Sequence, residues 1–123
     1  MVLIVDASAD LRFIYAEMLR RNGIDTAEAG SRAEALRVAR ERRPAALVID
    51  SSASDGEGAR LVAELGRDSR TAAIPVIFLR HWSEGPPPAA SAPVVAVRKP
   101  VDPRELLGAV QELLQRARRQ TTA

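Results

Sequence analysis

The chain has 123 residues and no cysteine, and its 18 basic and 16 acidic residues leave a formal charge of +2. The length fits one domain, and the missing cysteine excludes disulfides, thiol catalysis and cysteine metal sites. The scattered basic residues and the aromatic content of 3% argue against direct binding to nucleic acid. We expect a cytoplasmic protein without membrane contact, because the sequence shows neither a signal peptide nor the roughly 18-residue apolar run of a membrane span.

The chain begins with an apolar run and a helical pattern. Residues 2–5 are strand formers that end abruptly at Asp6, as in a strand buried on both faces of a parallel sheet. A helix follows, with Ser8 or Asp10 as its N-cap and Gly23 at its end. Helical spacing predicts that its buried face consists of Leu11, Ile14, Tyr15, Met18 and Leu19.

The same alternation continues to the middle of the chain. A short, weaker strand is predicted over residues 24–27. Ser31 and Glu34 form a capping box for a second helix, which Pro44 stops. Another buried-strand run over residues 45–49 again ends in an aspartate.

The second half opens with a polar loop over residues 51–58, followed by a helix that ends near Gly66. A fourth strand is predicted over residues 74–79. Residues 81–93 then hold four prolines and one glycine, so any regular helix there must be short or absent. A fifth strand is predicted over residues 94–97.

The last predicted helix has the clearest start signal. Asp102 is its N-cap, Pro103 stands at its first position and Glu105 completes the capping box. We expect one domain over residues 1–119 and a frayed tail over residues 120–123. The predicted apolar face of the helix consists of Leu106, Leu107, Val110, Leu113, Leu114 and Ala117.

Strands that alternate with helices predict an α/β fold with a parallel sheet and helices on both faces. Chemistry in such folds lies at the carboxyl ends of the strands. Asp6, Asp50, Arg80 and Lys99 stand at four of these ends, so we expect their side chains to converge. Two neighbouring carboxylates remain ionised only beside a cation, which Lys99, Arg80 or Mg²⁺ can supply.

Four features together resemble the receiver domain of two-component response regulators. They are the strand that ends in Asp6, the strand that ends in Asp50, the IPVIFL strand, and Lys99-Pro100 before a capped helix. The resemblance implies a non-enzymatic, flavodoxin-like doubly wound domain with five parallel strands in the order 2-1-3-4-5.

The resemblance also implies roles for particular residues. Asp50 accepts a phosphoryl group from a histidine kinase or phosphotransfer protein, and Lys99 contacts that group. Mg²⁺ is held by Asp6, Asp50 and the backbone carbonyl of Ser52. A downstream protein partner then reads the state of the domain.

Several positions depart from the family pattern. Ala7 replaces the second member of the acidic pair, Arg80 replaces a Thr or Ser, and Ala96 replaces an aromatic residue of the fifth strand. We therefore expect a degenerate receiver, or pseudo-receiver, in which Mg²⁺ binding is weak or absent. We also hypothesise that Arg80 pairs with Asp50 or Asp6 and partly substitutes for the metal.

Other functions compete with this interpretation. The same scaffold suits a phosphorylation-independent protein-interaction module. A small flavodoxin-like enzyme or cofactor binder is disfavoured, because the DASAD segment lacks the glycines of a nucleotide site. A DNA-binding regulator would need an output domain, so the chain would then be a fragment of a longer protein.

Overall fold

The computed structural model describes residues 1–50, 56–80, 93–99 and 101–122, with side chains described up to residue 119. The described strands form a single parallel sheet in the order β2-β1-β3-β4-β5, which confirms the predicted fold class. The elements in chain order are β1 (Val2–Val5), α1 (Ala9–Arg21), β2 (Thr26–Ala29), α2 (Arg32–Arg42), β3 (Ala46–Asp50), α3 (Glu57–Gly66), β4 (Val76–Arg80), β5 (Val94–Arg98) and α4 (Pro103–Thr122).

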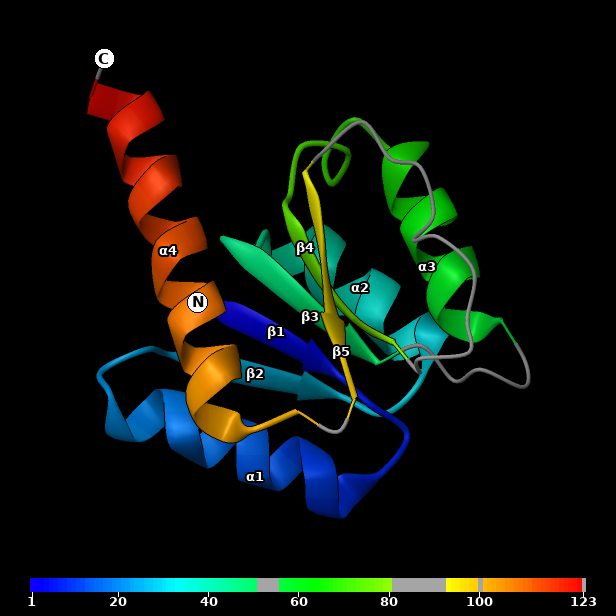
Figure 1. Ribbon diagram of the computed structural model, residues 1–123. Coiled ribbons are helices and arrows are strands. Elements are labelled where there is room, and N and C mark those ends of the chain that lie inside the picture. The colour runs from blue at the N-terminus through cyan, green and yellow to red at the C-terminus, as the bar shows by residue number, and fades with distance from the viewer. Residues whose placement is uncertain (51–55, 81–92, 100, 123) are drawn as a thin grey trace.

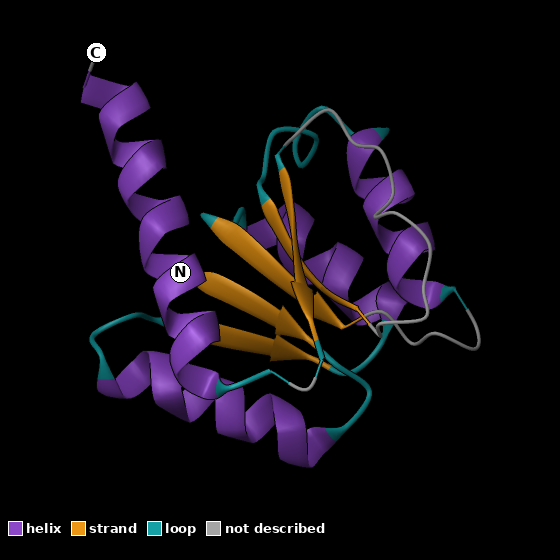
Figure 2. Cartoon of the chain, viewed as in Figure 1, coloured by secondary structure: helices purple, strands orange, loops and turns teal. Residues whose placement is uncertain are grey.

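Helices cover both faces of the sheet. Helices α1 and α4 lie on one face, and α2 and α3 lie on the other (Figure 1; Figure 2). Alternate strand residues therefore enter different cores: Leu3 packs in the cluster with α2 and α3, and Ile4 packs in the cluster with α1 and α4. Because the central strands are buried on both faces, their sequences are continuously apolar.

Helix α1 begins at the first of its two possible caps and buries a narrower face than predicted. The Ser8 hydroxyl accepts a hydrogen bond from the Leu11 backbone N–H at 3.3 Å. The predicted burial of Leu11 and Ile14 is wrong: they are 40% and 47% exposed, beside Phe13 at 58%. The helix turns Tyr15, Ala16 and Leu19 toward the sheet, so part of its apolar stripe faces solvent.

Strand β2 starts two residues later than the predicted strand because the end of α1 extends into the connection. Gly23, at a φ of +78°, donates its N–H to the Arg20 carbonyl, and Ile24 donates to the Leu19 carbonyl. This pair of bonds is a Schellman motif, which fixes Ile24 in the helix cap. Helix α2 ends at Arg42, two residues before the proline expected to stop it.

The second half follows the prediction within one or two residues. Asp102 accepts the Arg104 N–H at 2.8 Å, and Leu106, Val110 and Leu113 are the buried residues of α4. Helix α4 runs to Thr122, past the predicted domain end at residue 119, and its C-terminal half projects beyond the sheet (Figure 1). The predicted loss of a helix before β5 falls on residues 81–92, outside the described residues. Among the described helices, none is both long and apolar enough to cross a membrane.

Candidate functional site

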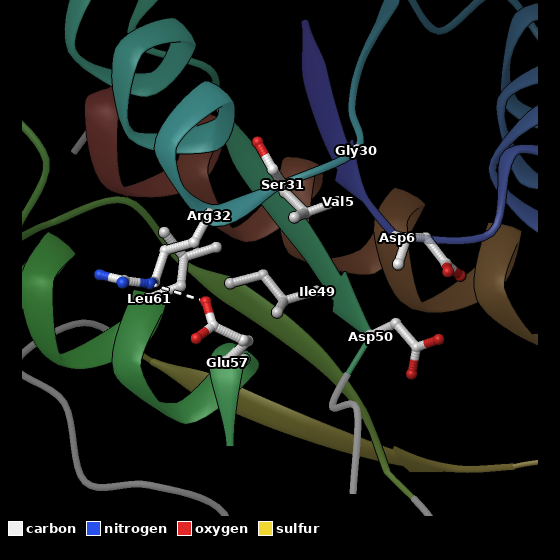
Figure 3. Close-up of a pocket in the computed structure, with 11 residues that line it drawn as sticks. Val5, Asp6, Gly30, Ser31, Arg32, Ile49, Asp50, Glu57 and Leu61 are labelled. Atoms are coloured by element: carbon white, nitrogen blue, oxygen red, sulfur yellow. Dashed lines mark hydrogen bonds and ion pairs between the residues drawn. The ribbon is translucent and has the colours of Figure 1, made fainter. Parts of the chain in front are cut away.

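Two aspartates meet at the carboxyl edge of the sheet. Val5 of β1 pairs in register with Ile49 of β3, so the next residues, Asp6 and Asp50, end adjacent strands. Their carboxylates turn to the same side, away from the ion pair between Arg32 and Glu57 (Figure 3). Asp6 is only 5% exposed, and the Asp50 side chain is 11% exposed. Two negative groups are thus held together with little access to water.

Lys99 supplies the positive charge at this edge. Its ammonium forms an ion pair with Oδ1 of Asp50, and its side chain is 28% exposed. The backbone holds it in place, because the Lys99 N–H donates to the Arg80 carbonyl at 2.8 Å. The structure therefore brings Asp6, Asp50 and Lys99 into one cluster and places Arg80 on the strand between the two partners of the ion pair.

The environment of Asp6 disfavours its charge. Burial raises the pKa of the Asp6 carboxyl, and the negative charge of Asp50 raises it further, while the Ser8 N–H bonded to Oδ1 at 2.8 Å and the charge of Lys99 lower it. The other carboxylate oxygen, Oδ2, is buried without a hydrogen-bond partner. Asp6 thus presents an unsatisfied acceptor that a cation at this edge would fill.

Comparison with known proteins identifies the arrangement. Residues 2–111 match the family model of the response regulator receiver domain. The chain belongs to this family. Receiver domains are generally signalling modules of two-component systems rather than enzymes, and they typically bind Mg²⁺ at the phosphorylation site.

Curated relatives and solved structures are consistent with this membership. The phosphate regulon transcriptional regulatory protein PhoB of Pseudomonas aeruginosa is 31% identical over 118 residues, covering 94% of this chain and 52% of PhoB. The receiver domain thus spans about half the length of the curated relatives that it matches.

Two solved structures share the fold. Vibrio cholerae chemotaxis protein CheY4 superposes with a TM-score of 0.79 at 24% identity, covering 91% of this chain and 96% of CheY4. A CheY-like receiver domain from Methanospirillum hungatei superposes with a TM-score of 0.84 at 17% identity, covering 96% of each chain.

The structure gives fewer contacts for the remaining predicted site residues. Arg80 ends β4 and is half-buried, and Ser52 lies outside the described residues. Ala7 is exposed and offers no side-chain ligand. Among the described residues, no group of three or more acidic, His or Cys side chains is placed to hold a metal. Asp6 and Asp50 still fit a Mg²⁺ ion that keeps several of its waters, because such an ion is often held by only one or two carboxylates.

A cavity of about 230 Å³ opens beside the two aspartates (Figure 3). Its apolar wall comprises Val5 of β1, Ile49 of β3 and Leu61 of α3. On its opposite rim, Arg32 forms ion pairs with Glu57 at 2.8 Å and with Glu64. These pairs tie the start of α2 to α3.

The sequence did not reveal the position of Tyr15 relative to the site. Helical spacing marks Tyr15 only as a core residue of α1, and the structure buries it at 6% exposure. Burial raises the pKa of its phenol, and the charges of Asp6 and Asp50 raise it further. The phenol therefore lies within the electric field of the two carboxylates.

Proposed function

We propose that Asp50 is the phosphoacceptor of this receiver domain. The ion pair between Lys99 and the Asp50 carboxylate, beside buried Asp6, is the observation that carries the proposal. A carboxylate oxygen of Asp50 attacks the phosphorus, the bond from phosphorus to the donor histidine breaks, and an acyl phosphate forms. Lys99 balances the negative charge of the transferred oxygens.

Mg²⁺ assists this transfer in our proposal. Asp6 and Asp50 would hold the ion, together with the backbone carbonyl of Ser52. When bound, it supplies positive charge to the phosphoryl oxygens. Two considerations support weak binding: Ala7 contributes no carboxylate, and affinity for hard cations falls with the number and charge of oxygen ligands.

Arg80 makes the site atypical. It ends the strand between Asp50 and Lys99, at the position where the family carries a hydroxyl. We propose that its fixed positive charge partly replaces the metal, because a guanidinium fits a carboxylate or phosphate in a planar, two-point contact.

We propose helix α1 as the docking surface for the phosphohistidine protein that donates the phosphoryl group. Leu11, Phe13 and Ile14 are the largest exposed apolar side chains of the helix. The helix starts three residues after Asp6, so this patch adjoins the carboxyl edge that a phosphodonor must reach. Exposed apolar clusters of this kind typically mark protein-binding surfaces.

Incubation with acetyl phosphate and Mg²⁺, followed by intact mass measurement, tests the phosphoacceptor. The wild-type protein is expected to gain one phosphoryl group, and Asp50→Asn is expected to gain none. Asp25→Asn is a matched control, because Asp25 is an exposed carboxylate that precedes β2, at the opposite end of the strands. Labelling that persists in Asp50→Asn would reject Asp50 as the acceptor.

A phosphorylation-independent interaction module is the alternative function. The absence of a side-chain ligand at Ala7 favours it, since the metal step is then impaired. In that case the wild-type chain stays unlabelled even at high Mg²⁺ concentration, yet still binds its downstream protein partner, and Asp50→Asn binds that partner equally well.

A further inference from the structure

Arg12 of α1 connects three segments around Asp6. Its Nη1 donates a hydrogen bond to the Asp6 carbonyl at 2.6 Å. Its Nε lies 3.4 Å from Oε1 of Glu28 in β2, an ion pair without hydrogen-bond geometry. The Arg12 side chain is only 20% exposed, so the guanidinium bridges α1, the end of β1 and β2 largely out of water.

Gly30 leaves the space that this guanidinium occupies. A Cβ atom at position 30 would lie 3.1 Å from Nη1 of Arg12, closer than an ordinary van der Waals contact. The glycine therefore leaves room for the guanidinium, which a larger residue at position 30 would have to displace slightly. The connection from β2 to α2 is shaped around the Arg12 side chain.

We infer that Arg12 is a positioning residue for the Asp6–Asp50 pair, an inference that rests on the proposed function of that pair. Three hydrogen bonds hold Asp6. Arg12 donates to its backbone carbonyl, the Ser8 N–H donates to Oδ1 of its carboxylate, and its own N–H donates to the Ala29 carbonyl of β2 at 3.1 Å. The bonds from Arg12 and Ser8 fix the carbonyl and the carboxylate of Asp6, so that its carboxylate lies beside Asp50.

The cost of the arrangement supports a role beyond packing. The Nε–H of Arg12 is buried without a hydrogen bond, and such a group destabilises a fold relative to a well-packed apolar side chain. The contact of the Arg12 guanidinium with Asp6, a residue of the acidic site, provides a reason for an arginine at this position.

Arg20 provides a matched control on the same helix. Its Nη2 lies 3.3 Å from Oε2 of Glu28 and donates to the Thr26 carbonyl. It therefore shares the Glu28 partner of Arg12, but its described side-chain contacts are with β2 and with Glu17 of its own helix, and not with Asp6. Arg20→Gln removes the same charge and two ion pairs, with Glu17 and Glu28, without removing the contact to Asp6.

Nuclear magnetic resonance of the Asp50 side-chain carboxyl tests the inference. Arg12→Gln is expected to shift this ¹³C resonance in metal-free protein and to weaken Mg²⁺ binding about tenfold, as loss of an outer partner of a metal ligand does. Gly30→Ala, which crowds Arg12, should shift both measurements in the same direction. Arg12→Lys keeps the charge and one donor and should recover part of the Mg²⁺ affinity, whereas Arg20→Gln should change neither measurement.

The outcomes separate this inference from the proposed function. If the wild-type chain binds no Mg²⁺, the metal proposal fails, and the metal-free Asp50 resonance still decides the role of Arg12. An Asp50 resonance unchanged in folded Arg12→Gln would overturn the inference. Equal shifts in Arg12→Gln and Arg20→Gln would also overturn it, because they would show a general effect of helix charge.

Discussion

Lys99 pairs with Asp50 across the end of an intervening strand. Asp50 ends β3 and Lys99 follows β5, while β4 lies between them in the sheet. The Lys99 N–H donates to the Arg80 carbonyl, and this hydrogen bond fixes the Lys99 backbone at the end of β4. The ion pair therefore depends on the registers of three strands, and it gives the two buried carboxylates their shared counter-charge.

Lys99→Met should destabilise the protein and reduce labelling of Asp50 by acetyl phosphate. Loss of the cation leaves Asp50 and Asp6 to repel each other out of water, at a cost of about 1–3 kcal/mol. The loss should grow from acidic to alkaline pH, because the buried Asp6 carboxyl, whose pKa is raised, is then ionised. Urea unfolding at several pH values measures it, with Lys99→Arg as the charge-preserving control. A variant as stable as wild type at alkaline pH would contradict the prediction.

Asp6→Asn should stabilise the metal-free protein at neutral pH. Burial raises the pKa of Asp6 in the folded state above the ordinary value of 3.8. The folded protein therefore binds this proton more tightly than the unfolded chain, and stability falls as pH rises through the folded-state pKa. The variant avoids that loss. Thermal unfolding with a chelator should show no difference at about pH 3 and a higher Tm for Asp6→Asn at pH 7. A lower Tm at pH 7 would refute this expectation.

Ala7→Asp should strengthen Mg²⁺ binding, by about tenfold in dissociation constant. The substitution restores the carboxylate that the family pattern has at this exposed position. Without Mg²⁺ the third negative charge should lower the Tm. Titration followed by NMR provides the affinity, and Ala7→Asn, which adds the same bulk without charge, is the control. Equal affinity in both variants would show that charge at position 7 is not the missing element.

Phe13→Ser should weaken docking of the phosphohistidine protein without impairing phosphorylation of Asp50 itself. Phe13 is 58% exposed, so the change should alter stability by less than about 0.5 kcal/mol. Labelling by acetyl phosphate should stay at the wild-type rate, while transfer from a phosphorylated histidine phosphotransfer protein should slow. Transfer of radiolabelled phosphate from the phosphotransfer protein measures the rate with that donor. Equal loss with both donors would show damage to the site rather than to a docking surface.

Arg32→Ala should weaken the connection between α2 and α3 only modestly, because its two ion pairs are partly exposed and screened by solvent. Arg37→Ala is the control. In the described part of the chain, Arg37 pairs with Glu41 of its own helix alone, at high exposure, so this substitution should destabilise the protein less. Urea unfolding at low and high salt measures both. A loss in Arg32→Ala that does not shrink at high salt would argue against an electrostatic origin.

Much of the fold follows from local sequence. The continuous apolar run of residues 2–5 indicates a strand with both faces covered. Ser31 marks the start of a helix, because its side chain accepts the Glu34 N–H three residues later. Strand-terminal Asp6 and Asp50 share an edge simply because parallel strands end on one side. These features depend on residues close in the chain, so their spacing reveals them.

Only the tertiary structure decided which of these residues touch. The order of the strands places Lys99 within reach of Asp50, and the rotation of α1 leaves Leu11 and Ile14 in solvent although their spacing suits a core. The contacts of Arg12 with Asp6 and Gly30, and of Arg32 with Glu64, join separate elements and leave no periodic signal. The sequence by itself determined the strand ends and the acidic edge, because these are local. The tertiary structure decided how that edge is charged and held, because this depends on packing between distant segments.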